Sequence, residues 1–271
     1  MQKRHFLVLS GFVLASLILD TASAQTPLDP KLVYVQVTAT QKDGRAVVGL
    51  AKENFKLYED NVQQDIVFFS GENDPLSIGV LLDVGRSMRD EMKAVAFDGL
   101  MKGAGPNDRV LLADFTDLSL NDAVHQALQK LLETRNKRVL VLFTMRNNPG
   151  AYSFSKVKEL LKDQDIQLYV IAIPPATGSS DADILREVSD LSGGAAFFPQ
   201  SMRSLPAIYL RIGAQMRHQY VLGYRPTNTA GNGKWRKIKV TSDTREMKPR
   251  VTLNLQSRAG YYAPTVASAR P

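Results

Sequence analysis

The stretch "LSIGVLLDVGRSM", residues 76 to 88, decides the fold class. Its first seven residues are almost all apolar and do not alternate with polar ones, which is typical of a strand buried on both faces. The run ends at the carboxylate of Asp83, and a helical pattern begins near Ser87. An acidic side chain at the end of a buried strand, followed by a glycine and a hydroxyl, is a common frame for a divalent cation.

Further apolar runs of the same kind follow, and amphipathic stretches separate them. The runs are "RVLLADF", "RVLVLF" and "QLYVIAI". This alternation predicts an α/β domain over residues 75–216, with a doubly wound, mainly parallel sheet. Such sheets bind ligands at the carboxyl ends of their strands. The polar residues expected at that edge are Asp83, Asp114, Thr116, Asp117 and Thr144.

Strand patterns flank this domain on both sides. Within residues 25–74, "VYVQVTA" alternates in polarity and Asp43-Gly44 is a hairpin signal. Strand patterns return over residues 217–262, before a tail at 263–271. We predict that the two flanking segments pair into one smaller β-sandwich-like module, with the α/β domain inserted, because this keeps the ends of the inserted domain close together.

The first 24 residues have the pattern of a secretory signal peptide. Lys3 and Arg4 precede an apolar run that ends at Leu19, and Ala22-Ser23-Ala24 is a small-residue cleavage pattern, so we predict cleavage after Ala24 and a secreted or periplasmic protein. An uncleaved anchor is the alternative, but the run is shorter than the roughly 18–20 residues that span a bilayer. No membrane span is expected in the mature chain.

The chain has no cysteine, which excludes disulfides and thiolate metal sites.

The chain is basic, with a formal net charge of +7. The densest basic stretch is "GKWRKIKV", which contains Lys234, Arg236, Lys237 and Lys239. Its alternation favours a half-buried strand with a solvated outer face, and a binding patch is the alternative. We predict no nucleic-acid partner.

Taken together, several stretches resemble the von Willebrand factor type A (VWA) domain family. The middle segment resembles the VWA domain itself, and the whole chain resembles bacterial exported VWA-related proteins, abundant in Acidobacteria, in which the domain lies between β segments. The matching stretches are "VTATQKDGRAVVGLAKENFKLYEDNVQQDI", "LSIGVLLDVGRSM", "NDRVLLADF", "LREVSDLSGGAAFFP", "QYVLGYRPTN", "KWRKIKV" and "GYYAP".

The resemblance implies a metal-ion-dependent adhesion site, but only part of its pattern is present. In the family, an Asp-x-Ser-x-Ser loop, a threonine and a second aspartate hold Mg²⁺ for a partner's acidic residue. Asp83 and Ser87 match the ends of the loop, whereas Gly85 replaces its middle serine. Met145 stands where the second aspartate is expected, and Leu118 where the threonine is expected. We therefore predict a degenerate site that binds no metal.

Two alternatives to this prediction stay open. The acidic and hydroxyl side chains Asp114, Thr116 and Asp117 are an alternative way to rebuild a Mg²⁺ site beside Asp83, although such residues are ordinary in an exposed loop. Tyrosines of the closing stretches, which are Tyr220, Tyr224, Tyr261 and Tyr262, either pack a β core or form a recognition surface.

Enzymatic function is not indicated. His5 belongs to the leader, His125 lies on an expected helix and His218 precedes an expected strand, so no histidine is placed as a catalytic base. Ser87 in "GRSMR" lacks the second glycine of a nucleophile elbow. No glycine-rich stretch carries the GK[ST] ending of a phosphate loop.

The sequence thus predicts an exported, non-enzymatic protein-binding protein without a cofactor. Its oligomeric state is left open. The alternative is a structural or assembly component of the cell envelope in which the α/β domain is a spacer, and a hydrolase with an unrecognised site is a third, weaker hypothesis. The expected partner-binding rim consists of Asp83, Gly85, Ser87, Asp114, Thr116, Asp117 and Thr144.

Overall fold

The computed structural model describes most of the chain after residue 28. The described residues are 29–71, 75–83, 86–102, 105, 107–113, 119–134, 137–145, 154–173, 179–243 and 252–265. The predicted signal peptide, residues 1–24, lies outside them. In the described part of the chain, no helix is long and apolar enough to cross a membrane.

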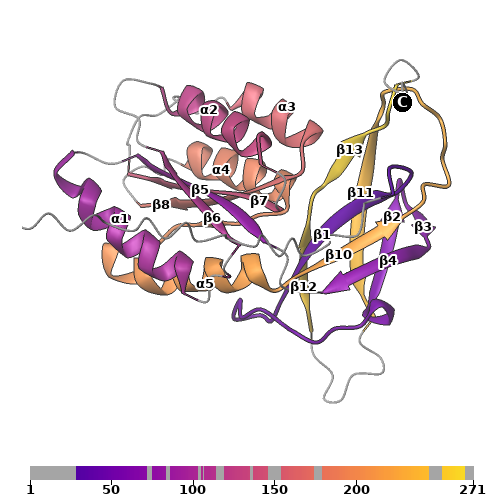
Figure 1. Ribbon diagram of the computed structural model, residues 1–271, viewed down its shortest axis with the longest axis horizontal. Helices are drawn as coiled ribbons and strands as arrows, with labels where there is room; N and C mark the ends of the chain where they lie inside the picture. The colour runs from indigo at the N-terminus through magenta and orange to yellow at the C-terminus, as the bar shows by residue number, and fades with distance from the viewer. Residues whose placement is uncertain are drawn as a thin grey trace, which may run out of the picture. The chain divides into compact units, whose positions relative to one another are not determined.

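Strands and helices alternate through the middle of the chain, and strands dominate both ends (Figure 1). The strands are β1 Val33–Thr40, β2 Phe55–Glu59, β3 Val62–Gln64, β4 Ile66–Gly71, β5 Leu76–Asp83, β6 Arg109–Ala113, β7 Lys137–Thr144, β8 Ile166–Ala172, β9 Ala196–Phe197, β10 Gln219–Tyr224, β11 Trp235–Ser242, β12 Asn254–Ser257 and β13 Gly260–Tyr262. The helices are α1 Arg86–Met101, α2 Leu120–Leu132, α3 Ser155–Asp163, α4 Ser179–Ser192 and α5 Leu205–Arg217, with two 3₁₀ turns, η1 Lys52–Asn54 and η2 Met202–Ser204.

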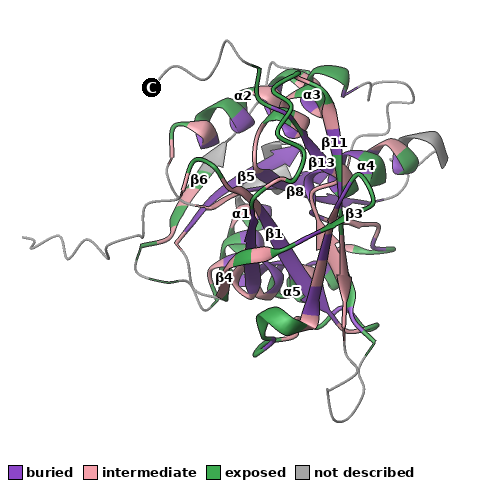
Figure 2. Ribbon diagram, turned by 90° about the vertical axis from the view of Figure 1, so that its right-hand side faces the viewer, coloured by how far each residue is buried: buried purple, intermediate pink, exposed green. Residues whose placement is uncertain are grey.

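The central sheet has the strand order β6-β5-β7-β8-β9, and all of its neighbouring strands are parallel. Every residue of β5 and of β8 is buried, as the purple ribbons of Figure 2 show. Burial on both faces explains why these strands are near-continuous apolar runs in the sequence. Parallel strands need crossover connections, which the helices supply.

Helices cover both faces of this sheet (Figure 1). On one face, Val124 and Leu128 of α2, Val157 of α3 and Leu185 of α4 share a core with side chains of β7 and β8. On the other face, Ala96 of α1 and side chains of α5 pack against the alternate residues of the same strands. The predicted doubly wound α/β sheet is confirmed.

Strands from the two ends of the chain form a smaller β module. Its two four-stranded sheets have the orders β12-β1-β10-β4 and β13-β11-β2-β3. Antiparallel pairs join the segment before the α/β domain to the segment after it: β1 pairs with β10 and β12, and β2 pairs with β11. Side chains of both sheets, such as Val37, Leu57, Leu222 and Ile238, share one core. The predicted insertion of the α/β domain into a β module is confirmed.

Strand β1 differs from a half-solvated strand because polar side chains on its second face are also buried. Gln36 donates to the carboxylate of Asp165 at 3.0 Å, and Gln219 donates to the hydroxyl of Thr38 at 3.3 Å. Gln219 also donates to the side-chain oxygen of Gln167, which precedes Leu168 in the parallel sheet. Hydrogen bonds to Asp165 and Gln167 of the α/β domain thus engage the side-chain N–H groups of Gln36 and Gln219 away from water.

Helices α2 and α3 start in different ways. Ser119 caps α2, because its hydroxyl accepts from the backbone N–H of Asp122 at 3.2 Å. Helix α3 starts without a side-chain cap. Phe154, in the left-handed conformation with φ 43°, precedes this helix and caps none of its N–H groups with its side chain, while its ring is buried in the core. Apolar burial therefore outweighs capping at this helix start.

Asp108 ties the start of β5 to the end of α5. Its carboxylate accepts from the backbone N–H of Leu76 at 2.8 Å and from that of Gly105 at 2.9 Å, and it forms an ion pair with Arg217. Burial opposes ionisation of Asp108, but the N–H donors and the guanidinium outweigh it, so the pKa of this carboxyl is lowered.

Replacing Asp108 with asparagine is expected to lower the free energy of unfolding at pH 7 by about 1–3 kcal/mol, because a charged acceptor of three donors is lost. Since the pKa of Asp108 is lower in the folded chain than in the unfolded one, the wild type should hold this stability above the unfolded pKa of about 3.9 and lose it as the pH falls through the folded value. Urea unfolding from neutral to acidic pH measures both effects.

The exposed Asp183, which pairs with Arg186 at 3.1 Å, is the matched control. Its replacement by asparagine should change the stability at pH 7 by less than about 0.5 kcal/mol. Equal pH dependence of the wild type and the Asp108→Asn variant would contradict the assignment.

Candidate functional site

The candidate site lies where the strand order of the parallel sheet reverses. The chain runs from β5 to β6 at one edge and then crosses back over β5 to β7. In open α/β sheets, ligands bind outside the carboxyl ends of the strands at such a switch point. Here β5 ends at Asp83 and β7 ends at Thr144, and these two residues are partners in the register of the sheet.

Asp83 and Thr144 are bonded to each other. The hydroxyl of Thr144 donates to Oδ2 of Asp83 at 2.8 Å. Both side chains are buried, with Asp83 3% exposed and Thr144 fully enclosed. The adjoining backbone is also held, since the N–H of Ile173 donates to the carbonyl of Thr144 at 3.2 Å. The pair is therefore a rigid feature of the sheet edge.

These two side chains do not fit the needs of Mg²⁺. The ion needs near-octahedral oxygen ligands and keeps several waters where the protein supplies few. Asp83 offers one carboxylate that is almost closed to solvent, and one of its oxygens already accepts from Thr144. Among the described residues, no group of three or more acidic, histidine or cysteine side chains is placed to hold a metal.

The remaining predicted rim residues are not placed by the structure. Gly85, Asp114, Thr116 and Asp117 lie outside the described residues. Ser87 belongs to the first turn of α1, but its side chain is not among those described. The structure thus brings together Asp83 and Thr144 of the predicted set.

The connection after β6 is short. Strand β6 ends at Ala113 and α2 begins at Leu120, and β6 is the edge strand of the sheet in the described part of the chain. The residues between these two elements are too few for a further strand and helix, given a typical strand length of about five residues.

His125 lines a shallow cavity of about 470 Å³ on the surface of α2 and α3. Its other lining residues are Ser155, Lys156, Lys158 and Glu159. Two of these are engaged in ion pairs, Lys158 with Glu187 at 2.7 Å and Glu159 with Lys162 at 2.8 Å. The ion pairs link α3 to α4 and one turn of α3 to the next, so we assign these side chains a structural role.

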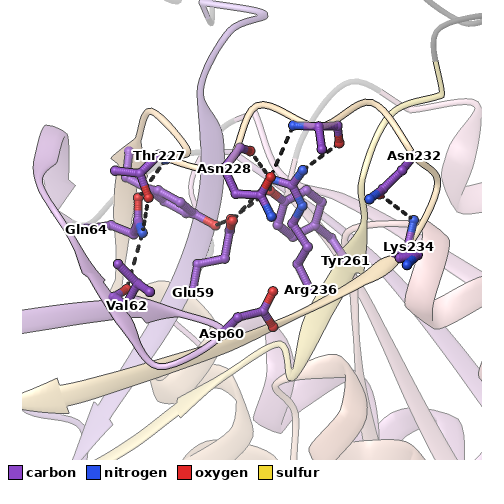
Figure 3. Close-up of polar contacts among 12 residues, drawn as sticks. Glu59, Asp60, Val62, Gln64, Thr227, Asn228, Asn232, Lys234, Arg236 and Tyr261 are labelled. Carbon is purple, nitrogen blue, oxygen red and sulfur yellow. Dashed lines mark hydrogen bonds and ion pairs between the residues drawn. The ribbon is translucent and has the colours of Figure 1, made fainter.

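Sequence reasoning missed a buried polar cluster in the β module. Figure 3 shows Glu59 at its centre. Its carboxylate accepts from Arg236 at 3.1 Å, from the hydroxyl of Tyr224 at 2.6 Å and from that of Tyr261 at 2.8 Å. The side chains of Arg236 and Glu59 are 4% and 2% exposed. Arg236 is therefore not part of the solvated face that its basic stretch suggested.

The cluster also holds a loop. The Arg236 guanidinium donates to the carbonyl oxygens of Asn228 and Ala230, the latter at 2.7 Å. These carbonyls belong to the connection between β10 and β11. Burial, followed by the hydrogen bond to the Glu59 carboxylate, raises the pKa of Tyr224 above its ordinary range and that of Tyr261 to about 12. Both phenols are therefore protonated donors at neutral pH.

A signal for this cluster was present in the alternation of the strands. Arg236 shares its parity in β11 with Ile238, and Glu59 shares its parity in β2 with Leu57. Both apolar partners are buried, so the two charged residues point to the same core. Opposite charges at core positions of neighbouring strands predict a buried pair.

The closing tyrosines divide between the two predicted roles. Tyr220, Tyr224 and Tyr261 are buried in the β core, and the hydroxyl of Tyr220 donates to the carbonyl of Val47 at 2.9 Å. Tyr262 is 37% exposed, and its hydroxyl donates to Glu159 of α3 at 3.2 Å. Core packing therefore explains three of these residues, and Tyr262 lies at the surface.

Comparison with known proteins finds similar solved structures. No protein-family model matches the chain, and no curated protein matches it in sequence. The chain is similar to the crystal structure of the ArnB paralog VWA2 from Sulfolobus acidocaldarius, at 12% identity and a TM-score of 0.44 over 86% of this chain and 76% of that chain. A likeness this distant carries no inference about the site, and the fold class rests on the strand order and helix placement described above.

Proposed function

We propose that the chain is an exported, non-enzymatic protein of the VWA type that binds a protein partner at the carboxyl edge of β5 and β7. The observation that carries the proposal is the buried Asp83–Thr144 pair at the switch point of the sheet. A rigid edge of this kind supports loops that contact a ligand. The VWA stretches of the sequence, including "LSIGVLLDVGRSM", support the family, and residues 1–24 support export.

Binding at this edge is proposed to be independent of a metal. The hydroxyl of Thr144 donates a hydrogen bond to the carboxylate of Asp83, so this carboxylate has a polar partner without a cation. A dication at this position would have to lose hydration against a single carboxylate, which is costly in a nearly closed site. Contact with the partner would then depend on the size and polarity of the residues that follow β5, β6 and β7 in the sequence.

Capture of a partner tests this function. The mature protein, immobilised and exposed to an extract of the producing cell's envelope, is expected to retain a partner equally well in Mg²⁺ and in EDTA. A variant with Thr116→Ala and Asp117→Asn is expected to lose most of that capture, because both residues belong to the predicted rim, between β6 and α2 in the sequence. Quantitative mass spectrometry of the bound fraction measures the difference.

A second variant, Lys237→Gln and Lys239→Gln, alters exposed residues of β11 and tests the alternative in which the β module makes the contacts. Capture that persists when Thr116 and Asp117 are replaced, but is lost when Lys237 and Lys239 are replaced, would contradict the proposal. It would favour an envelope component that makes its contacts through the β module. Capture abolished by EDTA, together with saturable Mg²⁺ binding in calorimetry that Asp83→Asn removes, would overturn metal independence.

A further inference from the structure

The outer face of the sheet β13-β11-β2-β3 presents lysines beside aromatic rings. In β11, Arg236 and Ile238 point into the core, so the alternate residues Trp235, Lys237 and Lys239 point outward. The register places Tyr262 opposite Trp235 and Tyr58 opposite Lys239. Partners opposite each other in an antiparallel pair lie on the same face, so the five side chains Trp235, Lys237, Lys239, Tyr262 and Tyr58 form one surface, here called the β11 face.

The aromatic part of the β11 face is held in place by its neighbours. The rings of Trp235 and Tyr262 have centroids 5.2 Å apart and planes 70° apart. The indole also packs directly on Gly260, where an added Cβ would come within 2.6 Å of an indole carbon. Tyr262 is anchored in turn by its hydrogen bond to Glu159. The Trp235 indole is therefore half-buried and pre-positioned, which lowers the entropic cost of binding to its accessible part.

The cationic part of the β11 face is open to solvent. Lys237 and Lys239 are exposed, and Lys234 is exposed just before the strand. Lys56, on the neighbouring strand β2, forms an ion pair with Asp243 at 3.1 Å and so contributes less charge. The whole chain carries a net charge of +7, which adds a long-range attraction for anions.

We infer that the β11 face binds an anionic polysaccharide, with its sugar rings on Trp235 and its carboxylates on Lys237 and Lys239. Sites for single-stranded nucleic acid stack successive bases on several rings. In the described part of this face, the ring that meets Trp235 is turned on edge to it, and Tyr58 lies opposite a lysine two residues further along β11. The arrangement therefore favours a charged polymer that stacks a single ring on Trp235. This surface contains no residue of the β5–β7 edge, so it is independent of the function proposed above.

The position of Trp235 makes the inference directly measurable. It is the single tryptophan of the chain, so intrinsic tryptophan fluorescence reports on the β11 face alone. Titration of the mature protein with polygalacturonate is expected to give a saturable change in this fluorescence, with an affinity that falls as salt is raised. The Lys237→Gln and Lys239→Gln double variant is expected to bind about tenfold more weakly, because two exposed cations are lost.

The matched control is a Lys102→Gln and Lys130→Gln double variant, which removes the same charge at exposed positions after α1 and on α2. It should weaken binding by less than about twofold, since screening limits the effect of distant charges. The inference is overturned if fluorescence does not change, if both double variants weaken binding equally, or if oligothymidylate binds more tightly than polygalacturonate.

Discussion

The Arg236→Ala variant is expected to lose about 3–5 kcal/mol of its free energy of unfolding. The change removes the guanidinium that pairs with Glu59 at 3.1 Å, in a place where both side chains are nearly closed to water. The Glu59 carboxylate would then be buried with only the hydroxyls of Tyr224 and Tyr261 to stabilise its charge. The carbonyls of Asn228 and Ala230 would also lose their donor.

Urea unfolding at pH 7 measures this loss, and Lys237→Ala is the matched control. Lys237 is the next residue of β11 but is exposed, so its replacement should change the stability by no more than about 0.5 kcal/mol. A further change of Glu59 to Gln in the Arg236→Ala background should recover part of the loss, because an uncompensated buried charge is removed. A loss below about 1 kcal/mol for Arg236→Ala would show that the cluster is hydrated in solution.

Replacing Phe143 with alanine is expected to cost about 3–5 kcal/mol of stability in the α/β domain. Phe143 lies on β7, a central strand, and has no exposed surface. It shares a core with Ile171 of β8 and with side chains of α1 and α5. Truncation would remove most of a large apolar side chain and leave a cavity between the sheet and both helices, because rigid strands cannot close around it.

Phe97 of α1 provides the matched control for this truncation. It is 49% exposed, so its replacement by alanine should cost less than about 1 kcal/mol. Thermal unfolding followed by circular dichroism compares the two variants with the wild type. If the Phe143→Ala variant were as stable as the Phe97→Ala variant, the core between β7 and α5 would be packed differently from the structure described above.

Both expected effects concern the scaffold, yet they bear on function in different ways. Phe143 immediately precedes Thr144, so a cavity at this position would loosen the bonded pair at the candidate site. Arg236 lies between Trp235 and Lys237 in β11, so its loss would disturb the β11 face instead. Partner capture should therefore be more sensitive to Phe143→Ala, and polysaccharide binding to Arg236→Ala.

Much of the fold follows from the sequence because burial leaves a direct pattern. Strands enclosed on both faces, such as β5 and β8, must be apolar at nearly every position, and this separates them from the alternating strands of the β module. The insertion of one domain into the other followed from strand patterns at both ends of the chain. The start of α3 did not follow, because Phe154 is positioned by its burial in the core and not by a capping group.

The candidate site was predictable only as a set of positions. Parallel strands end at the same edge, so Asp83 and Thr144 could be expected near each other from the sequence. That the hydroxyl of Thr144 donates to the carboxylate of Asp83 depends on side-chain directions that strand patterns do not carry. The same is true of Arg236, whose basic neighbours suggested a solvated strand while its parity with Ile238 pointed inward.

The sequence by itself determined the sheet type, the flanking of the α/β domain by strand segments, and the residues that end β5 and β7, because hydrophobic burial repeats at fixed local spacings. Tertiary structure alone decided which charged groups meet. Glu59 and Arg236 are far apart in the chain, and Asp83 and Thr144 are brought together by a crossover, so their pairing depends on register and packing between distant segments.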